Sequence, residues 1–172
     1  MSVTGDIVAT YRGPGRVVRR LLSAGPREDR ALAIVMAGCV LFFVSQWPAA
    51  AREAHLTETD LTPLLSGLLM GWVFIAPLGL YALAAVSHLV ARALGGQGTF
   101  YSARLALFWA VLAVGPLTLL NGLVMGFIGE GAALQLVGAI WLAMFLWFWG
   151  RGLIVAETKT TPDLTTPPKE TP

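Results

Sequence analysis

Four long apolar stretches constrain this chain more than any other feature. They run from about Ala31 to Trp47, Leu64 to Leu94, Leu105 to Ile128 and Ala132 to Val155. Charged residues make up 13% of the chain, whereas a soluble domain carries about 25%. The deficit lies in the apolar stretches, and each of them is long enough to cross a bilayer as a helix. The sequence therefore predicts an all-α, polytopic membrane protein with a bundle of four transmembrane helices.

The basic residues predict the orientation of that bundle. Eleven of the 12 Lys and Arg residues would lie on one side of the membrane, and only Arg52 would lie on the other, in a net acidic loop. Because Lys and Arg accumulate on the cytoplasmic side, we expect both termini in the cytoplasm of a bacterium and a multi-pass protein in its inner membrane. The net charge of +2 is too small to suggest nucleic acid as a partner.

The chain divides into three predicted parts. Residues 1–30 form a cytoplasmic segment, residues 31–156 the four-span membrane domain, and residues 157–172 a Thr- and Pro-rich cytoplasmic tail that we expect to be disordered. Residues 1–14 show no sustained helical periodicity.

A short basic segment within the first part has a clear helical pattern. Apolar residues between Val17 and Leu22 occupy one face, and Arg16, Arg19 and Arg20 occupy the other. This pattern predicts an amphipathic helix at the membrane surface, with its arginines toward lipid headgroups. Alternatively, the arginines are an ordinary positively charged flank without a binding role.

Proline and glycine predict irregularities in the first three spans. Trp47 and Pro48 should end the first span, and residues 51–62 should form an external loop. The second span is longer than a bilayer needs, so it should tilt, extend beyond the membrane or kink at Pro77. The third span is interrupted at Gly115-Pro116, where two shorter helices could meet.

Residues that could perform chemistry are few. The pattern contains no nucleophile paired with a base and no metal-ligand spacing, and it predicts neither a catalytic site nor a cofactor. The one cysteine, Cys39, excludes an intramolecular disulfide. His88 is the one histidine within a span, where it could be functional or simply bonded to a neighbouring helix or headgroup. Asn121 is among the deepest polar residues, and its simplest role is an interhelical hydrogen bond.

Two similar segments suggest close helix packing. Residues 64–72 and 119–127 each contain a Gly-x-x-x-Gly pattern, formed by Gly67 and Gly71 and by Gly122 and Gly126. Such a pattern places two glycines on one helix face, where another backbone can approach closely. At the same predicted depth on antiparallel spans, the two faces should pack together or form an oligomer contact, unless the similarity arises by chance.

The layout resembles that of bacterial members of the Yip (Ypt-interacting protein) family. The resemblance covers about residues 27–155 and rests on the order of spans, on Gly95-Gly96-x-Gly98-Thr99-Phe100 after the second span, and on Pro116 in the third. Eukaryotic members of the family have five spans and an Asp-Leu-Tyr-Gly-Pro stretch, whereas this chain has four and only Tyr11-Arg12-Gly13-Pro14. The resemblance implies a helical membrane protein and transfers no functional residue.

These observations predict a non-enzymatic protein that acts through helix contacts. It would serve as a scaffold or accessory component for other membrane proteins or lipids, with the bilayer and other membrane proteins or further copies of itself as partners. The alternative is an oligomeric transporter or pore for a small or apolar solute, favoured by the broken helices. Active transport is disfavoured because no Asp, Glu, Lys or Arg lies in the middle of a span.

Overall fold

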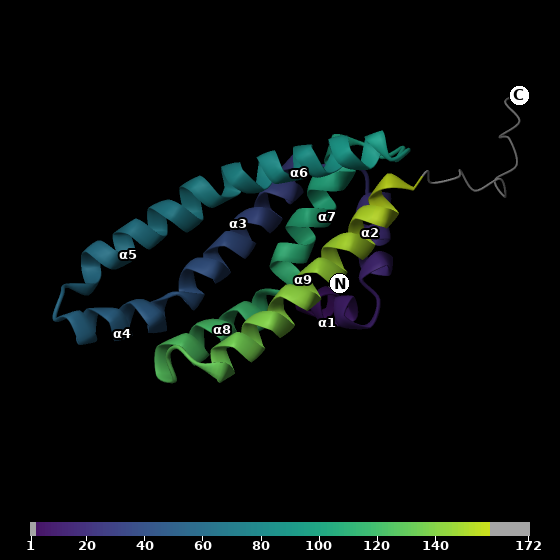
Figure 1. Cartoon of the computed structure of the whole chain (residues 1–172). Helices are drawn as coiled ribbons and strands as arrows, with labels where there is room; N and C mark the ends of the chain where they lie inside the picture. The colour runs from purple at the N-terminus through teal and green to yellow at the C-terminus, as the bar shows by residue number, and fades with distance from the viewer. Residues whose placement is uncertain (1–2, 159–172) are drawn as a thin grey trace, which may run out of the picture.

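A computed structural model of the chain describes residues 3–158, which form helices and no strands. The chain order is α1 (Val3–Arg12), α2 (Pro14–Ser23), α3 (Glu28–Ser45), α4 (Trp47–Thr57), α5 (Leu61–Leu69), the π-helix η1 (Met70–Ile75), α6 (Ala76–Ala93), α7 (Phe100–Ala113), α8 (Gly115–Phe127) and α9 (Ala132–Glu157). Figure 1 shows an elongated bundle of these helices. The all-α class predicted from the sequence is confirmed.

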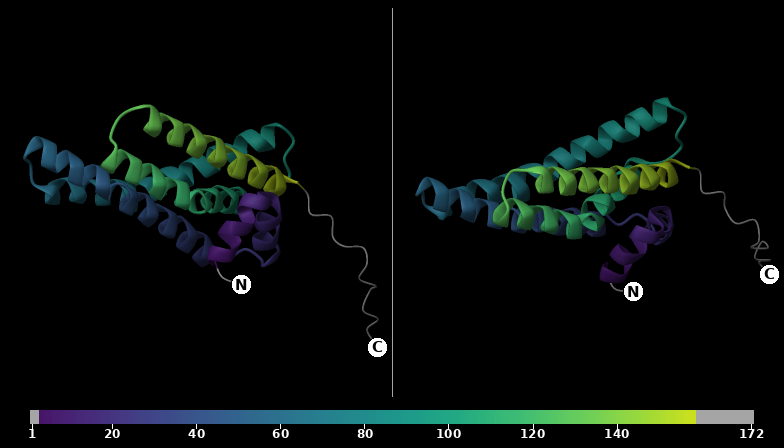
Figure 2. Two further views of the ribbon diagram at one scale, coloured as in Figure 1. Left: turned by 90° about the horizontal axis from the view of Figure 1, so that it is seen from below. Right: turned by 60° about the horizontal axis from the view of Figure 1, so that its bottom comes forward.

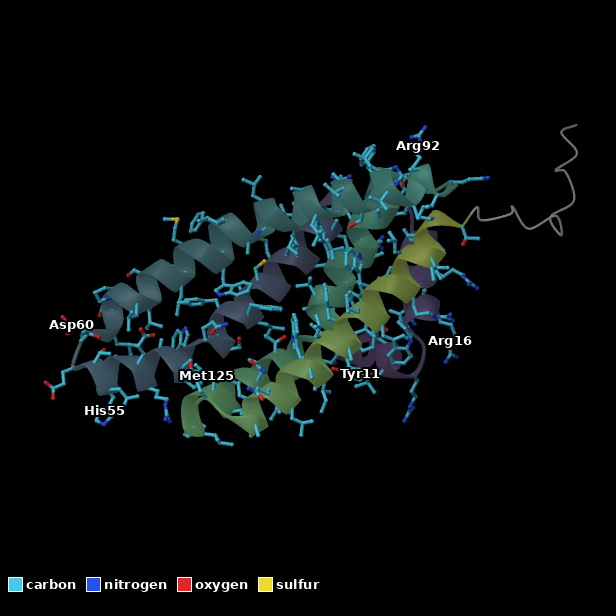
Figure 3. The ribbon with its side chains drawn as sticks, in the orientation of Figure 1. Tyr11, Arg16, His55, Asp60, Arg92 and Met125 are labelled. Atoms are coloured by element: carbon cyan, nitrogen blue, oxygen red, sulfur yellow. The ribbon has the colours of Figure 1, made fainter. Side chains whose placement is uncertain are left out.

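Three helical stretches among the described residues are long and apolar enough to cross a membrane. They comprise Glu28–Thr57, Leu61–Ala93 and Ala132–Glu157. A fourth span is formed if α7 and α8, which meet at an angle of 44°, are counted as one broken helix. The prediction that two helices meet at Gly115-Pro116 is therefore confirmed. We call the two ends of the bundle the Glu157 end and the Asp60 end; Figure 3 shows Arg16 and Arg92 at the first and His55 and Asp60 at the second.

Helix α7 forms the centre of the bundle. It packs against α1, α2, α3, α6 and α9, and its residues from Ser102 to Ala113 are buried with the exception of Arg104. Its sequence explains this position, because a helix that is apolar on every side is stable where other helices surround it. Thr99 and Ser102 start the helix with a reciprocal capping box. The other long helices leave many apolar side chains exposed, including Phe74 and Leu78.

The first span is longer than the sequence suggested. Pro48 does not end the helix: α4 begins at Trp47 and continues to Thr57, so most of the predicted external loop is helical. Proline is tolerated here because it occupies the first turn of α4, where its missing N–H would have no partner in the helix. The chain reverses over Glu58–Asp60, where Glu58 adopts a positive φ of 51°.

The second span contains a π-helix beside the predicted kink. η1 directly precedes Ala76, and Pro77 lies in the first turn of α6. A π-helical turn widens the backbone and relieves the clash that proline otherwise makes with the carbonyl one turn earlier. The run from Leu61 to Ala93 has 33 residues, or about 50 Å of helix, well beyond the ~30 Å of a hydrocarbon core.

The N-terminal segment differs most from expectation. Residues 3–12 form α1, and α1 and α2 make a hairpin beside the Glu157 end of α9 (Figure 2). The Trp109 Nε1–H donates to Thr10 Oγ1 over 2.9 Å, and the ring centroids of Tyr11 and Phe148 lie 5.0 Å apart. These contacts with α7 and α9 stabilise a helix that its own sequence pattern does not predict.

Candidate functional site

A groove lies between the second helical stretch, Leu61–Ala93, and α9. Its walls are η1 and α6 on one side and α9 on the other, and these walls converge at the Glu157 end and diverge toward the Asp60 end (Figure 1). Three adjoining cavities of about 500, 250 and 340 Å³ follow one another along it. Leu83 lines the first two, and Phe42, Trp72 and Trp141 line the last two.

One side-chain stripe on each wall lines the groove from end to end. On the second span the stripe comprises Trp72, Ala76, Gly79, Leu80, Leu83, Ser87, Val90 and Leu94, and on α9 it comprises Leu134, Gly138, Trp141, Phe145, Trp149, Leu153 and Glu157. Apart from the adjacent residues Gly79 and Leu80, spacings of three and four residues keep each stripe on one helix face. From residue 134 to residue 157 the groove extends about 35 Å along α9, which exceeds the thickness of a hydrocarbon core.

A buried pair of polar residues closes the groove at the Glu157 end. His88 Nδ1 on α6 lies 2.7 Å from Glu157 Oε1 on α9, and the side chains are 1% and 7% exposed. The second carboxylate oxygen, Oε2, accepts a hydrogen bond of 3.0 Å from the Gly98 N–H. The His88 ring also packs on Phe100, with ring centroids 4.3 Å apart. Both side-chain oxygens of Glu157 therefore have a hydrogen-bond partner, as buried polar groups require.

The glycine-rich loop after α6 wraps around this carboxylate. The Gln97 N–H donates to the Glu157 carbonyl over 2.9 Å. A Cβ on Gly96 would lie 2.8 Å from Glu157 Oε2, and one on Gly98 would overlap the Ala156 carbonyl. Glycine is thus needed at both positions because the loop backbone touches the end of α9. We name His88, Glu157 and Gly98 the latch, since they join α6, the loop and α9.

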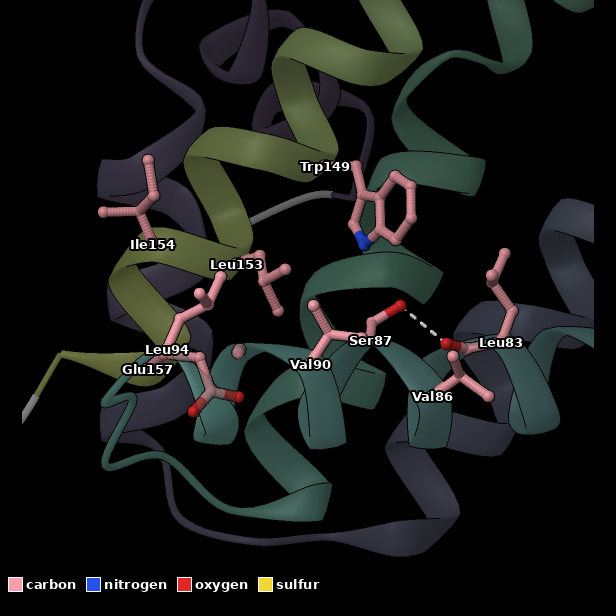
Figure 4. Close-up of a pocket in the computed structure, with 10 residues that line it drawn as sticks. Leu83, Val86, Ser87, Val90, Leu94, Trp149, Leu153, Ile154 and Glu157 are labelled. Carbon is pink, nitrogen blue, oxygen red and sulfur yellow. Dashed lines mark hydrogen bonds between the residues drawn. The ribbon is translucent and has the colours of Figure 1, made fainter.

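The compartment next to the latch contains an unpaired donor. It is apolar apart from Ser87, Glu157 and the Trp149 indole (Figure 4). The Ser87 hydroxyl donates to the Leu83 carbonyl over 2.6 Å, so it is not paired with His88 as a nucleophile would be. Trp149 Nε1 is buried and has no hydrogen-bond partner among residues 3–158. A buried donor without an acceptor is costly to the fold.

The compartment toward the Asp60 end is more polar. Ser45, Gln46, Thr118 and Asn121 line it, together with Phe42, Trp72 and Trp141. The Trp141 Nε1–H donates to Thr118 Oγ1 over 2.8 Å. Three irregular points of the bundle contribute to its lining. Gln46 lies at the junction of α3 and α4, Trp72 lies in the π-helix η1, and Thr118 lies in the first turn of α8 after the break from α7. Of the predicted polar residues, Asn121 thus lies in this compartment and His88 in the latch, about a span apart.

The predicted glycine contact is corrected by the structure. Gly122 and Gly126 lie where α8 meets the first span, since a Cβ on them would overlap the Ser45 carbonyl and Pro48 respectively. A Cβ on Gly67 or Gly71 would meet nothing within 4 Å. The two patterns therefore do not pack against each other within one chain, because α4 rather than α5 lies against α8. An oligomer contact through Gly67 and Gly71 stays a prediction.

The basic helix also differs from expectation. Val17 and Val18 of α2 are buried against the bundle, so its apolar face is covered by protein and does not rest in lipid. Arg16, Arg19 and Arg20 remain exposed on the other face.

Glu157 and Trp149 are the site residues that the sequence pattern missed. Glu157 was assigned to the disordered tail, although it is the last residue of α9 and buried; residues 159–172 of that tail lie outside the described part of the chain. One sequence feature could have indicated the latch. A single histidine lies inside a span, and the loop that follows this span contains three glycines.

The fold and this groove define the class of protein: an all-α bundle whose apolar helices are suited to a membrane. Among residues 3–158, no group of three or more His, Cys, Asp and Glu side chains is placed to hold a metal ion. No protein-family model, curated protein or solved structure matches the chain.

Proposed function

We propose that this protein is a non-enzymatic accessory component of a membrane that binds a transmembrane helix of a partner protein in the groove between α6 and α9. The observation that supports this most is the length of the groove. It extends about 35 Å along α9, whereas a lipid acyl chain reaches only through one leaflet, half of a core ~30 Å thick. An occupant that fills the groove throughout is therefore itself membrane-spanning.

The lining supports a helix as the occupant. Ala76 and Gly79 on one wall and Gly138 on the other are small, and small residues let a neighbouring helix approach closely. A Cβ on Gly79 would meet nothing within 4 Å, so the space beside it is free for another chain. The Asn121 amide offers hydrogen bonds to Ser or Thr side chains, which commonly join membrane helices.

A photocrosslinking pair on α6 tests the proposal. A benzophenone side chain at Leu83 would lie in the groove, whereas one at Leu78, which is 73% exposed and does not line the groove, would face lipid. We expect Leu83 to crosslink in native membranes to a transmembrane peptide of one partner at fixed stoichiometry, and Leu78 not to do so. Adducts with lipid alone, or equal labelling from both positions, would overturn it.

A blocking variant makes this test sharper. Gly138→Trp should fill the groove, because a Cβ there has only the Asn121 amide nitrogen nearby, at 3.7 Å. Gly150→Trp is the matched control, since a Cβ at Gly150 meets nothing within 4 Å and Gly150 does not line the groove. The Leu83 crosslink should disappear with Gly138→Trp and persist with Gly150→Trp.

A carrier of small neutral solutes is the second candidate function. The polar compartment around Gln46, Thr118 and Asn121 favours it, because broken helices that line a polar cavity are a feature of transporters. Purified protein in liposomes would then conduct small hydrogen-bonding solutes, and Asn121→Leu would slow the flux. Liposomes with protein that are no more permeable than empty ones would eliminate this candidate.

A further inference from the structure

The α1–α2 hairpin carries a second concave site, distinct from the groove. A cleft of about 520 Å³ lies between the two helices, and its lining includes Arg12, Arg16 and Arg20. Arg16 and Arg20 are four residues apart on α2 and lie on one face of that helix, and Arg12 ends α1 beside the turn. Val8, Ala9 and Val17 contribute an apolar wall.

The orientation of α2 explains why the arginines gather there. Val18 is 1% exposed and packs toward Gly152 of α9, while Val17 is also buried. Because the bundle holds the apolar face of α2, the arginines cannot be the snorkelling side chains of a helix lying in lipid. Arg12, Arg16 and Arg20 instead line the space between α1 and α2.

The charges in the cleft are unbalanced. Asp6 of α1 forms an ion pair with Arg20. Arg12 and Arg16 have no carboxylate within ion-pair distance among residues 3–158. The cleft therefore retains a surplus of two positive charges, which an anion of matching size would neutralise.

The turn between the helices positions one of these arginines. The Gly13 N–H donates to the Ala9 carbonyl over 3.0 Å and closes the end of α1. A Cβ on Gly13 would lie 2.7 Å from Arg16 Nε and 2.8 Å from Nη2. The Arg16 guanidinium thus rests against the turn, where a larger residue would displace it.

We propose that this cleft binds the phosphate group of an anionic phospholipid in the leaflet next to the Glu157 end. Guanidinium groups bind phosphate through paired, charge-assisted hydrogen bonds. The volume is in the range of about 300–1,000 Å³ typical of ligand pockets. Val3 and Val8 of α1 are 57% and 60% exposed. Apolar surface beside unpaired guanidiniums suits an amphiphile better than a free phosphate ion.

Lipid retention by the purified full-length chain tests the site. Native mass spectrometry would compare phosphatidylglycerol with phosphatidylcholine, for the wild type and for the double variant Arg12→Gln/Arg16→Gln. The matched control is Arg92→Gln/Arg151→Gln, which removes the same charge from exposed positions outside the cleft. We expect the wild type and the control to retain phosphatidylglycerol preferentially, and the cleft variant to bind it at least ~10-fold more weakly, because each lost charged hydrogen bond has about that effect.

Two further measurements keep the proposal falsifiable. Gly13→Val should weaken phosphatidylglycerol binding without removing any charge, since it displaces Arg16. Millimolar inorganic phosphate should not displace the lipid; complete displacement would show a site for free anions and overturn the lipid assignment. Equal losses in the cleft variant and the control would show non-specific attraction and overturn it as well.

Discussion

His88 on α6 and Glu157 on α9 are 69 residues apart in the chain, and their side chains meet at 2.7 Å. This contact closes the groove at the end where its walls converge. The same carboxylate holds the Gly98 N–H, so one acidic side chain fixes two helices and the loop between α6 and α7.

Loss of His88 should therefore destabilise the Glu157 end. His88→Ala leaves the buried Glu157 Oε1 without its partner, and an unsatisfied buried polar atom costs roughly 1–3 kcal/mol. We expect a clear fall in the melting temperature of the protein in detergent micelles. Glu130→Gln, at an exposed turn residue, should leave it unchanged. An unaltered melting temperature of His88→Ala would show that the latch does not stabilise the bundle.

Replacing the Glu157 carboxylate by an amide should destabilise the protein less than the loss of His88. Glu157→Gln keeps an oxygen that can accept from the Gly98 N–H and an amide that can donate to His88. The melting temperature should therefore fall less than with His88→Ala, and the double variant should resemble His88→Ala rather than add both losses. Additive losses in thermal unfolding would mean that the two residues act independently.

The close approach of α8 to the first span gives a stability prediction with a matched control. Gly122→Val should overlap the Ser45 carbonyl and destabilise the protein by about 1–3 kcal/mol or more. Gly67→Val introduces the same side chain where a Cβ meets nothing within 4 Å, and should leave unfolding in detergent almost unchanged. Equal effects of the two substitutions would contradict the packing described for α8.

Gly67 and Gly71 can still serve in self-association. Both lie on a face with free space, where a second copy could approach. If such an oligomer forms, Gly67→Ile should reduce crosslinked dimers in native membranes without lowering the melting temperature. Undiminished dimers in the variant would exclude this face as the contact.

The anchoring of α1 can be measured by proteolysis. Trp109→Phe removes the hydrogen bond to Thr10 Oγ1 and should weaken the docking of α1 by about 1 kcal/mol. Trypsin should then cleave at Arg12 roughly 5-fold faster, since cleavage follows the population of the undocked state. Trp147→Phe, at a side chain that is 43% exposed, is the control and should leave the rate unchanged.

Local sequence signals predicted the features that depend on local chemistry. The end of the second span at residues 94–98 and the break at Gly115-Pro116 follow from glycine and proline, whose backbone effects act within a few residues. The expectation that proline ends a helix was wrong at Pro48. Proline interrupts a continuing helix, but it also suits the first turn of a new one, as in α4. Only the neighbouring helices decide between these outcomes.

The sequence by itself determined that the chain forms apolar helices suited to a membrane, because hydropathy and backbone preference belong to each residue and its near neighbours. The tertiary structure alone decided that α7 is enclosed, that α8 lies on α4, and that Glu157 meets His88. These features depend on how helices distant in the chain are rotated and tilted against one another. In a chain with apolar residues on most helix faces, periodicity does not specify which face meets which partner.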